Sequence, residues 1–206
     1  MVAQLVLWRH GQTDYNKAGR FQGQVDVPLN ATGRAQAAAT APVVAAFGID
    51  SIHSSDLTRA RTTAQALADV TGLPVHENPH LRELSVGDWE DLTREEVGAR
   101  WPDQLEAWNT GQDVRPPGGE SRTESTARVV AAIREIVADA GEDETVAVVA
   151  HGAVLRGAAE ALLGLGTDDT GHLGVMTNCG YGVLTPRRGT WVLRHWSAGE
   201  DPGAVA

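Results

Sequence analysis

Two short apolar runs constrain the fold of this chain more strongly than any other feature. Residues 3–8 are AQLVLW and residues 145–150 are TVAVVA, with almost no polar position in either run. A strand without polar alternation is buried on both faces, which is typical of a parallel sheet covered by helices on both sides. His10 follows the first run after one residue, His151 follows the second directly, and each histidine precedes a glycine. If the two strands are parallel neighbours, both imidazoles lie at the carboxyl edge of the sheet, where open α/β sheets bind ligands.

The rest of the chain alternates between helical and extended patterns. Capping residues, alanine-rich runs and terminating glycines predict helices, whereas short apolar runs between turn residues predict strands. This alternation predicts an α/β fold of three layers, with a mainly parallel sheet and helices on both faces. A short turn joins the last two strands, so we expect them to be antiparallel at one edge of the sheet. The predicted helices span about residues 32–47, 56–70, 121–140 and 153–163, and the other predicted strands span residues 50–53, 74–77, 182–185 and 191–196.

The continuity of the chain predicts one domain over residues 1–206, because no low-complexity segment interrupts it. We expect a helical, lid-like excursion at about residues 92–119, where Thr93 and Glu96 fit a capping box. Cys179 has no second cysteine to pair with, which fits a reducing compartment and a small packed side chain. No apolar stretch approaches membrane-spanning length, so we expect a cytoplasmic protein.

The charge of the chain restricts its partners. The formal net charge of −10 argues against binding to nucleic acid or to a membrane surface, since both usually require a basic face. A small phosphorylated substrate is still compatible with this charge, because it needs only a local cluster of cations. For the oligomeric state the sequence offers only a base rate, which favours a homodimer.

The segment around the first histidine carries the groups that a histidine nucleophile needs. Residues 9–16 are RHGQTDYN. A nucleophilic imidazole must be neutral, and the neighbouring guanidinium of Arg9 disfavours the charged form of His10. The fork of Arg9 can also bind phosphate oxygens, while Thr13 and Asn16 can supply neutral donors. The segment therefore predicts a phosphate-binding site with a nucleophile in it.

Two further segments offer a cation and a carboxylate. Arg59 and Arg61 stand two residues apart at the start of a predicted helix, so they do not share a face and at most one reaches the site. The spacing alone leaves open which of the two it is. Glu83 lies in a loop and can donate a proton to a leaving alkoxide, although a salt bridge to Arg82 or another arginine is a competing interpretation.

Four motifs in this order, RHGQTDYN, SSDLTRARTTA, RELSVGDWE and VVAHG, resemble the histidine phosphatase superfamily, the phosphoglycerate mutase-like group. The resemblance extends over essentially the whole chain. It implies a phosphorylated nucleophile at His10, a proton donor and later base at Glu83, and no metal or cofactor. Gly152 follows the second histidine, where the next helix offers N–H groups to an anion. The resemblance further implies that Arg9, Arg59 and His151 complete the phosphate pocket, assisted by Asn16.

Within this superfamily, RFQGQVD, PPGGESR and VLRHW are similar to the glucosyl-3-phosphoglycerate phosphatases. This similarity implies that Gln22 contacts the substrate and that a carboxylate and a sugar lie beside the phosphate. Asp91 departs from the pattern, since many relatives have glycine after Trp-Glu.

Phosphatase activity is favoured over mutase activity because the excursion lacks basic residues. Residues 90–112 contain only Arg94 and Arg100 as cations, against six acidic residues. A mutase must hold a second anionic group and exclude water from the phosphoenzyme, for which this segment is poorly suited. A phosphoglycerate mutase and a catalytically silent phosphate-binding protein remain the alternatives.

A metal site is not predicted. His76 and His80 are four residues apart, but Pro79 makes a regular helix between them improbable and no third ligand is apparent. The sequence therefore favours two loop histidines.

Overall fold

The two apolar runs pair at the centre of the sheet. In the computed structural model, which describes residues 2–165 and 172–198, they are β1 (Gln4–Arg9) and β4 (Thr145–Ala150). The two strands are parallel, and Arg9 is the register partner of Ala150. His10 and His151 each follow their strand by one residue, so both leave the sheet at the same point of the same edge. The predicted juxtaposition of the two histidines is confirmed.

Within the described residues, six strands form one sheet in the order β3-β2-β4-β1-β5-β6. The pairs β3–β2, β2–β4 and β4–β1 are parallel, whereas β1–β5 and β5–β6 are antiparallel. The predicted mainly parallel sheet is confirmed, but the antiparallel part is larger than the final hairpin, because β5 also runs against β1. The other strands are β2 (Ser51–Ser54), β3 (Val75–Glu77), β5 (Tyr181–Arg187) and β6 (Thr190–Ala198).

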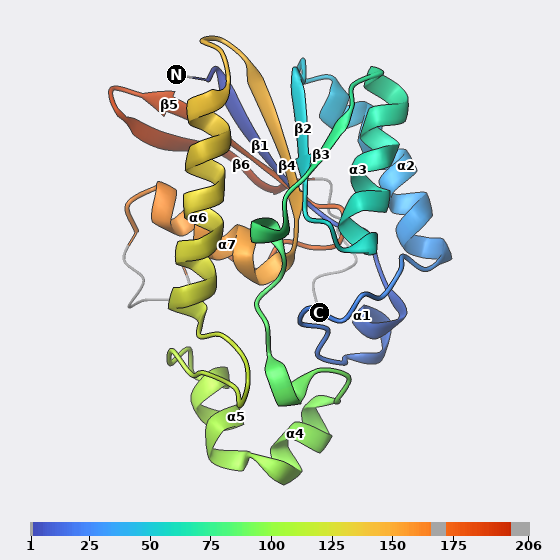
Figure 1. The fold of residues 1–206 in the computed structure, drawn as a ribbon, viewed down its shortest axis with the longest axis vertical. Helices are drawn as coiled ribbons and strands as arrows, with labels where there is room; N and C mark the ends of the chain where they lie inside the picture. Colours follow the sequence, from blue (N-terminus) through green and yellow to red (C-terminus); the bar gives the residue numbers. More distant parts are fainter. Residues whose placement is uncertain (1, 166–171, 199–206) are drawn as a thin grey trace.

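Helices cover both faces of the sheet, which confirms the predicted three layers. Figure 1 shows α2 and α3 on one side and α6 and α7 on the other. β4 is buried at every position and contributes side chains to both hydrophobic cores. Val148 lies in the core under α6 and α7, and Val149 lies in the core under α2 and α3. Because both faces of β4 are buried, its sequence does not alternate between apolar and polar residues. The helices are α1 (Asp14–Ala18), α2 (Ala31–Ala45), α3 (Thr58–Thr71), α4 (Arg94–Arg100), α5 (Pro102–Asn109), α6 (Arg122–Asp139) and α7 (Gly152–Leu162).

Local chemistry explains where several helices begin. Asn30 caps α2 by accepting a hydrogen bond from Gly33 N, so this helix starts earlier than the sequence pattern predicts. The sequence patterns did not predict the short α1, which is held by a capping box between Thr13 and Asn16. The predicted capping box at Thr93 is present and starts α4.

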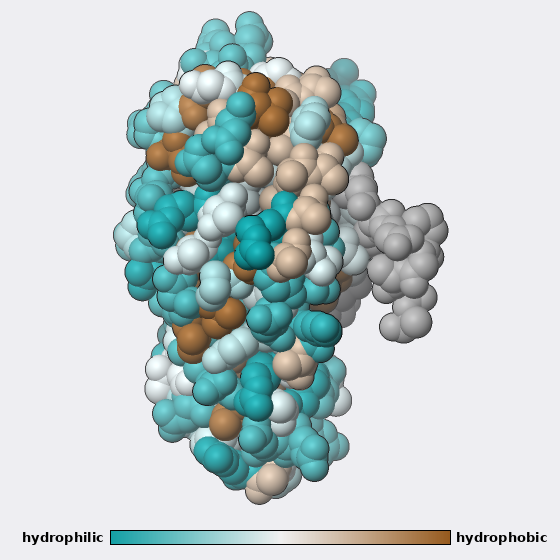
Figure 2. Space-filling model, turned by 90° about the vertical axis from the view of Figure 1, so that its right-hand side faces the viewer, coloured by the Kyte–Doolittle hydropathy of each residue, from teal (hydrophilic) through white to brown (hydrophobic). Residues whose placement is uncertain are grey.

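The excursion forms a lobe below the sheet, made of α4 and α5 (Figure 1). Its apolar side chains point inward, where the ring of Trp108 lies 5.5 Å from that of Trp89 and 6.4 Å from that of Phe21, measured between centroids. On the face shown in Figure 2 the lobe is mostly hydrophilic, with isolated hydrophobic residues. Among the described residues, no helix is both long and apolar enough to cross a bilayer.

Candidate active site

The imidazole of His10 has a defined tautomer. Its Nδ1 lies 2.7 Å from the carbonyl oxygen of Gly11, which can only accept, so Nδ1 carries the proton and Nε2 keeps its lone pair. The side chain is 2% exposed. Burial, followed by the charges of Arg59 and Arg9, holds the pKa of His10 well below its usual value. His10 is therefore a neutral base with a lone pair on Nε2 at physiological pH.

Arg9 lies across the start of α7. A Cβ atom at Gly152 would come within 3.2 Å of Arg9 Nε, so the absence of a side chain at Gly152 lets the guanidinium approach the helix. Arg9 Nη1 donates to the carbonyl of Met176. Arg9 Nε is buried and has no hydrogen-bond partner among the described residues. This N–H is a donor that an oxyanion in the site can use.

Of the two arginines on α3, Arg59 is the one that reaches the site. It is 0% exposed, and its Nη1 and Nη2 donate to the carbonyls of Val25 (2.7 Å) and Gly23 (2.8 Å). Burial is the main reason why its pKa falls to about 10, which still leaves it charged at neutral pH. Arg61 is 49% exposed and lies 3.8 Å from Glu77, so it is the surface cation.

His151 is held between Arg59 and Ser55. Arg59 Nε donates to His151 Nδ1 at 3.2 Å, and His151 Nε2 lies 2.9 Å from Ser55 Oγ. Because a guanidinium never accepts a hydrogen bond, Nδ1 must be the unprotonated nitrogen and Nε2 must carry the proton. Burial, together with Arg59 and His10, lowers the pKa of His151 well below its usual value. The rings of His10 and His151 meet edge to face with their centroids 5.1 Å apart.

Glu83 is held by the N-terminus of α7 and not by Arg82. Its Oε1 accepts from Val154 N at 3.2 Å, and its Oε2 accepts from Ala153 N at 3.3 Å. The free N–H groups of a helix N-terminus favour a carboxylate in this position. Arg82 instead donates to Asp56, with 2.8 Å between Nε and Oδ1. The competing interpretation, a salt bridge from Glu83 to Arg82 or another arginine, is wrong, because no arginine of the described residues lies within ion-pair distance of Glu83.

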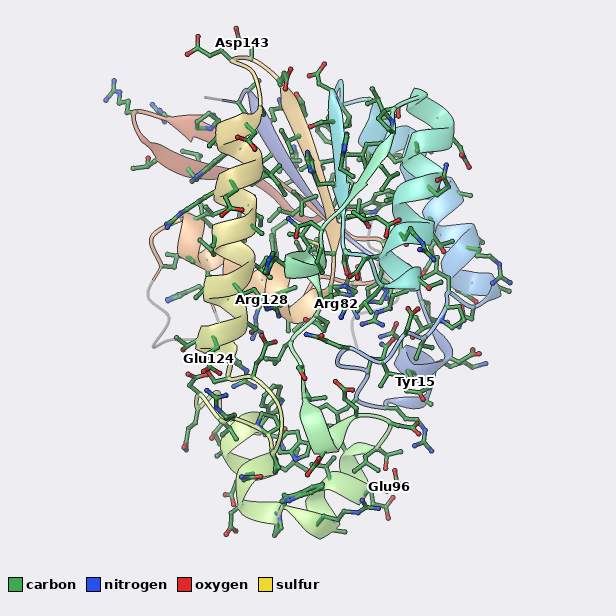
Figure 3. All side chains as sticks on the ribbon, in the orientation of Figure 1. Tyr15, Arg82, Glu96, Glu124, Arg128 and Asp143 are labelled. Carbon is green, nitrogen blue, oxygen red and sulfur yellow. The ribbon has the colours of Figure 1, made fainter. Side chains whose placement is uncertain are left out.

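Arg128 positions the backbone around Glu83. From α6 it donates to the carbonyls of Arg82 (3.0 Å) and Glu83 (3.3 Å), and its Nε lies 2.9 Å from Glu120 Oε1. Figure 3 labels Arg128 on α6 and Arg82 on the segment that passes beside this helix. No sequence motif pointed to Arg128.

The predicted binding residues Asn16 and Gln22 meet at Thr13. Thr13 Oγ1 lies 3.0 Å from Asn16 Oδ1 and 2.9 Å from Gln22 Oε1. Asn16 Oδ1 also accepts from Asn178 Nδ2 (3.3 Å), which in turn donates to the carbonyl of His10 (3.1 Å). Both residues therefore belong to the network around the nucleophile, and their substrate contacts stay predictions. The sequence patterns missed Asn178, which lies far from the histidine motif along the chain.

His76 and His80 lie outside this network, whereas the backbone N–H of Cys179 donates to the carbonyl of His10 at 3.2 Å. His76 is on β3, stacked on His53 of β2 with ring centroids 5.3 Å apart, so the prediction of a loop position for His76 is wrong. His80 lies in the short helical turn Pro79–Leu81. Among the described residues, no group of three or more His, Cys, Asp or Glu side chains has an arrangement suited to a metal ion. Burial raises the pKa of the Cys179 thiol to about 12, so it is not a thiolate at neutral pH.

In sequence, this chain is similar to proteins named as phosphatases and to one named as a mutase. The chain is 41% identical to the glucosyl-3-phosphoglycerate phosphatase of Mycolicibacterium vanbaalenii, over 100% of this chain and 90% of the relative. It is 39% identical to the protein of the same name from Mycobacterium tuberculosis, over 96% of this chain and 88% of the relative. A 2,3-bisphosphoglycerate-dependent phosphoglycerate mutase of Methylobacterium sp. is also 39% identical, over 80% of this chain and 82% of the mutase.

The chain is also similar to a solved structure of a phosphatase with the same name as two of these relatives. A mycobacterial glucosyl-3-phosphoglycerate phosphatase in complex with VO3 superposes with a TM-score of 0.90 at 40% identity, over 96% of this chain and 100% of that chain. The family model described as histidine phosphatase superfamily (branch 1) matches residues 5–199. The chain belongs to the histidine phosphatase superfamily.

Proposed function

We propose that this protein is a phosphatase that hydrolyses phosphomonoesters through a phosphohistidine on His10. The observation that carries the proposal is the buried, neutral imidazole of His10, which keeps a lone pair on Nε2 and lies close enough to Arg9 and Arg59 for their charges to lower its pKa. A neutral nitrogen nucleophile surrounded by fixed positive charge suits attack on an anionic phosphorus centre.

In the first displacement, Nε2 of His10 attacks phosphorus and the bond from phosphorus to the ester oxygen breaks. Glu83, held as a carboxylate by the N-terminus of α7, takes up a proton from solvent before this step and gives it to the departing oxygen, so an alcohol leaves. In the second displacement, the Glu83 carboxylate takes a proton from water, and the resulting hydroxide attacks phosphorus. The bond from Nε2 to phosphorus then breaks and inorganic phosphate is released.

The cations of the pocket stabilise the charge of both transition states. Phosphoryl transfer depends mainly on positioning and on neutralising the three equatorial oxygens. Arg9 Nε is free to donate, and Arg59 is held in one orientation by its bonds to two carbonyls. The Nε2–H of His151 is a third donor, if it leaves Ser55 for the phosphate. None of these roles requires a metal ion.

The proposed substrate is a small phosphorylated acid such as glucosyl-3-phosphoglycerate. The support for it is the name shared by two relatives of 39–41% identity that the chain matches over nearly its whole length. A phosphoglycerate mutase is the second candidate, since one relative of 39% identity bears that name. The acidic excursion over residues 90–112 favours hydrolysis over retention of the phosphoryl group.

The test is phosphate release from p-nitrophenyl phosphate, 3-phosphoglycerate and glucosyl-3-phosphoglycerate in the presence of EDTA, with His10→Ala as the control. We expect release that survives EDTA, is lost in the variant and is fastest with the glucosylated ester. Equal rates over the panel would remove the support for the named substrate. Isomerised phosphoglycerate would favour the mutase, and no turnover at all would favour a silent phosphate-binding protein. The homodimer, the cytoplasmic location and the lack of a nucleic-acid partner stay predictions.

A further inference from the structure

A cavity of about 400 Å³ lies between α6 and α7, beside the segment that carries Glu83. One face of α7 forms a wall of it, through Ala153, Arg156, Gly157 and Glu160. These residues are spaced i, i+3, i+4 and i+7, which places them on one side of a helix. The N-terminal turn of α6 and the turn at residues 111–113 form the other walls.

The cavity lies beside Glu83, which does not itself line it. Ala153 lines it, and the backbone N–H of Ala153 holds Glu83 Oε2 at 3.3 Å. Leu84, the residue after Glu83, lines it as well. A proton donor must lie within hydrogen-bond reach of the departing oxygen, so the rest of the leaving group has to lie close to Glu83. The cavity is a space of suitable size at that position.

Two arginines supply positive charge to this cavity. Arg122 is fixed, because it donates to the carbonyls of Gln112 (2.8 Å) and Trp108 (2.9 Å) and lies 3.9 Å from the centroid of the Trp108 ring. Burial and the charge of Arg156 both lower the pKa of Arg122, which places the two guanidinium groups within electrostatic range of each other. Among the described residues, no carboxylate lies within ion-pair distance of Arg156.

The two acidic residues of the cavity accept hydrogen bonds from backbone N–H groups, and the charge of Asp113 also acts on Arg122. Asp113 Oδ1 accepts from Thr123 N at 3.1 Å and so helps to cap α6. Glu160 Oε1 accepts from Leu173 N at 3.1 Å. Besides these residues the walls carry hydroxyl and amide groups, from Thr126 and Gln112 among others. A carboxylate with neighbouring hydroxyl groups matches this set of donors, since Arg binds carboxylates through a planar fork.

We propose that this cavity binds the leaving group of the substrate, a hydroxyl-rich carboxylic acid, and that Arg156 binds its carboxylate. The inference rests on the proposed function of the adjoining site. It assigns Arg156 to substrate selection and not to the chemistry of phosphoryl transfer.

The test compares 3-phosphoglycerate with glycerol 3-phosphate, because the glycerol ester has a hydroxymethyl group where the acid has its carboxylate. We expect Arg156→Met to lower kcat/KM for 3-phosphoglycerate by roughly 10- to 100-fold, the usual effect of losing a charge-assisted hydrogen bond. Hydrolysis of glycerol 3-phosphate is expected to stay within about twofold of the unmodified protein, and Arg156→Lys is expected to recover part of the loss. Arg134→Met, an exposed arginine of α6, is the matched control and is expected to change neither substrate.

An equal loss for both substrates in Arg156→Met would overturn the proposal, and so would no loss for either. A parallel measurement needs no turnover: binding of the two esters to His10→Ala, with and without Arg156→Met, by titration calorimetry. Selective weakening of 3-phosphoglycerate binding would support the cavity assignment even if the protein hydrolysed nothing. Loss of turnover with selective binding would therefore contradict the proposed function alone, whereas binding that Arg156→Met does not change would contradict this inference.

Discussion

Arg59 Nε donates to His151 Nδ1 across 3.2 Å, and this contact determines the protonation of the second histidine. It leaves His151 Nε2 as the N–H donor, which lies 2.9 Å from Ser55 Oγ. One arginine from α3 therefore organises a histidine from the end of β4, and a serine from the end of β2 completes the arrangement. The direction of the one N–H that His151 can offer to a phosphate depends on Ser55.

Ser55→Ala is expected to lower kcat by about tenfold, because the ring of His151 loses the contact that orients its Nε2–H and is freed to turn. Steady-state kinetics with p-nitrophenyl phosphate measures this. Ser54→Ala is the matched control, since Ser54 is equally buried but its hydroxyl donates to the carbonyl of Ser55. The same loss in both variants would show that packing, and not the contact with His151, is responsible.

Gly152→Ala is expected to reduce kcat/KM while leaving the fold intact. Its Cβ would meet Arg9 Nε at 3.2 Å, so the guanidinium must shift, and a shift of this kind costs on the order of tenfold in rate. Alanine is itself acceptable in the first turn of a helix, so we expect the thermal midpoint to change little. Gly174→Ala serves as the control, because a Cβ there meets no atom within 4 Å. Unfolding of Gly152→Ala, in place of a kinetic defect, would contradict this explanation.

Glu83→Gln is expected to affect substrates according to their leaving groups. Hydrolysis of 3-phosphoglycerate, whose alkoxide needs a proton, should fall by about 10²- to 10⁴-fold. With p-nitrophenyl phosphate the first displacement needs little help, so a burst of nitrophenolate equal to the enzyme concentration should precede slow turnover. Rapid-mixing absorbance measures the burst. Arg82→Gln should not reproduce this pattern, because Arg82 binds Asp56. Equal losses with both substrates and no burst would contradict proton donation by Glu83.

The two buried histidines are expected to make stability fall at acid pH. Their pKa values lie well below the usual value in the folded protein, so below about pH 6.5 the unfolded chain binds protons that the folded chain does not. The free energy of unfolding therefore decreases as pH falls, by up to about 1.4 kcal/mol for each histidine between about pH 7.5 and 5.5. Urea unfolding at both pH values measures this.

The comparison between His10→Gln and the unmodified protein isolates one of these contributions, because glutamine does not titrate. The variant should lose less stability on acidification. An equal loss in the two proteins would mean that His10 takes up its proton in the folded state as readily as in the unfolded chain.

Several features of the protein follow from the sequence alone. The apolar runs 3–8 and 145–150 predicted buried parallel strands, because a residue that faces a core on either side cannot be polar. Once those strands are neighbours, the histidine that follows each must lie at the same edge. The spacing of Arg59 and Arg61 likewise predicted that only one of them enters the site, since residues two apart on a helix point in different directions.

Only the tertiary structure decided the partners of these residues. Arg59 and His151 are 92 residues apart, and Glu83 and Val154 are 71 apart, so no local pattern encodes either contact. Arg82 stands next to Glu83 in the chain, yet it binds Asp56 while α7 binds Glu83. The cavity at Arg156 likewise exists only where α6, α7 and the 111–113 turn meet. Local periodicity specifies which face of an element is buried, whereas hydrogen-bond partners depend on how separate elements pack, and that is settled only when the whole chain folds.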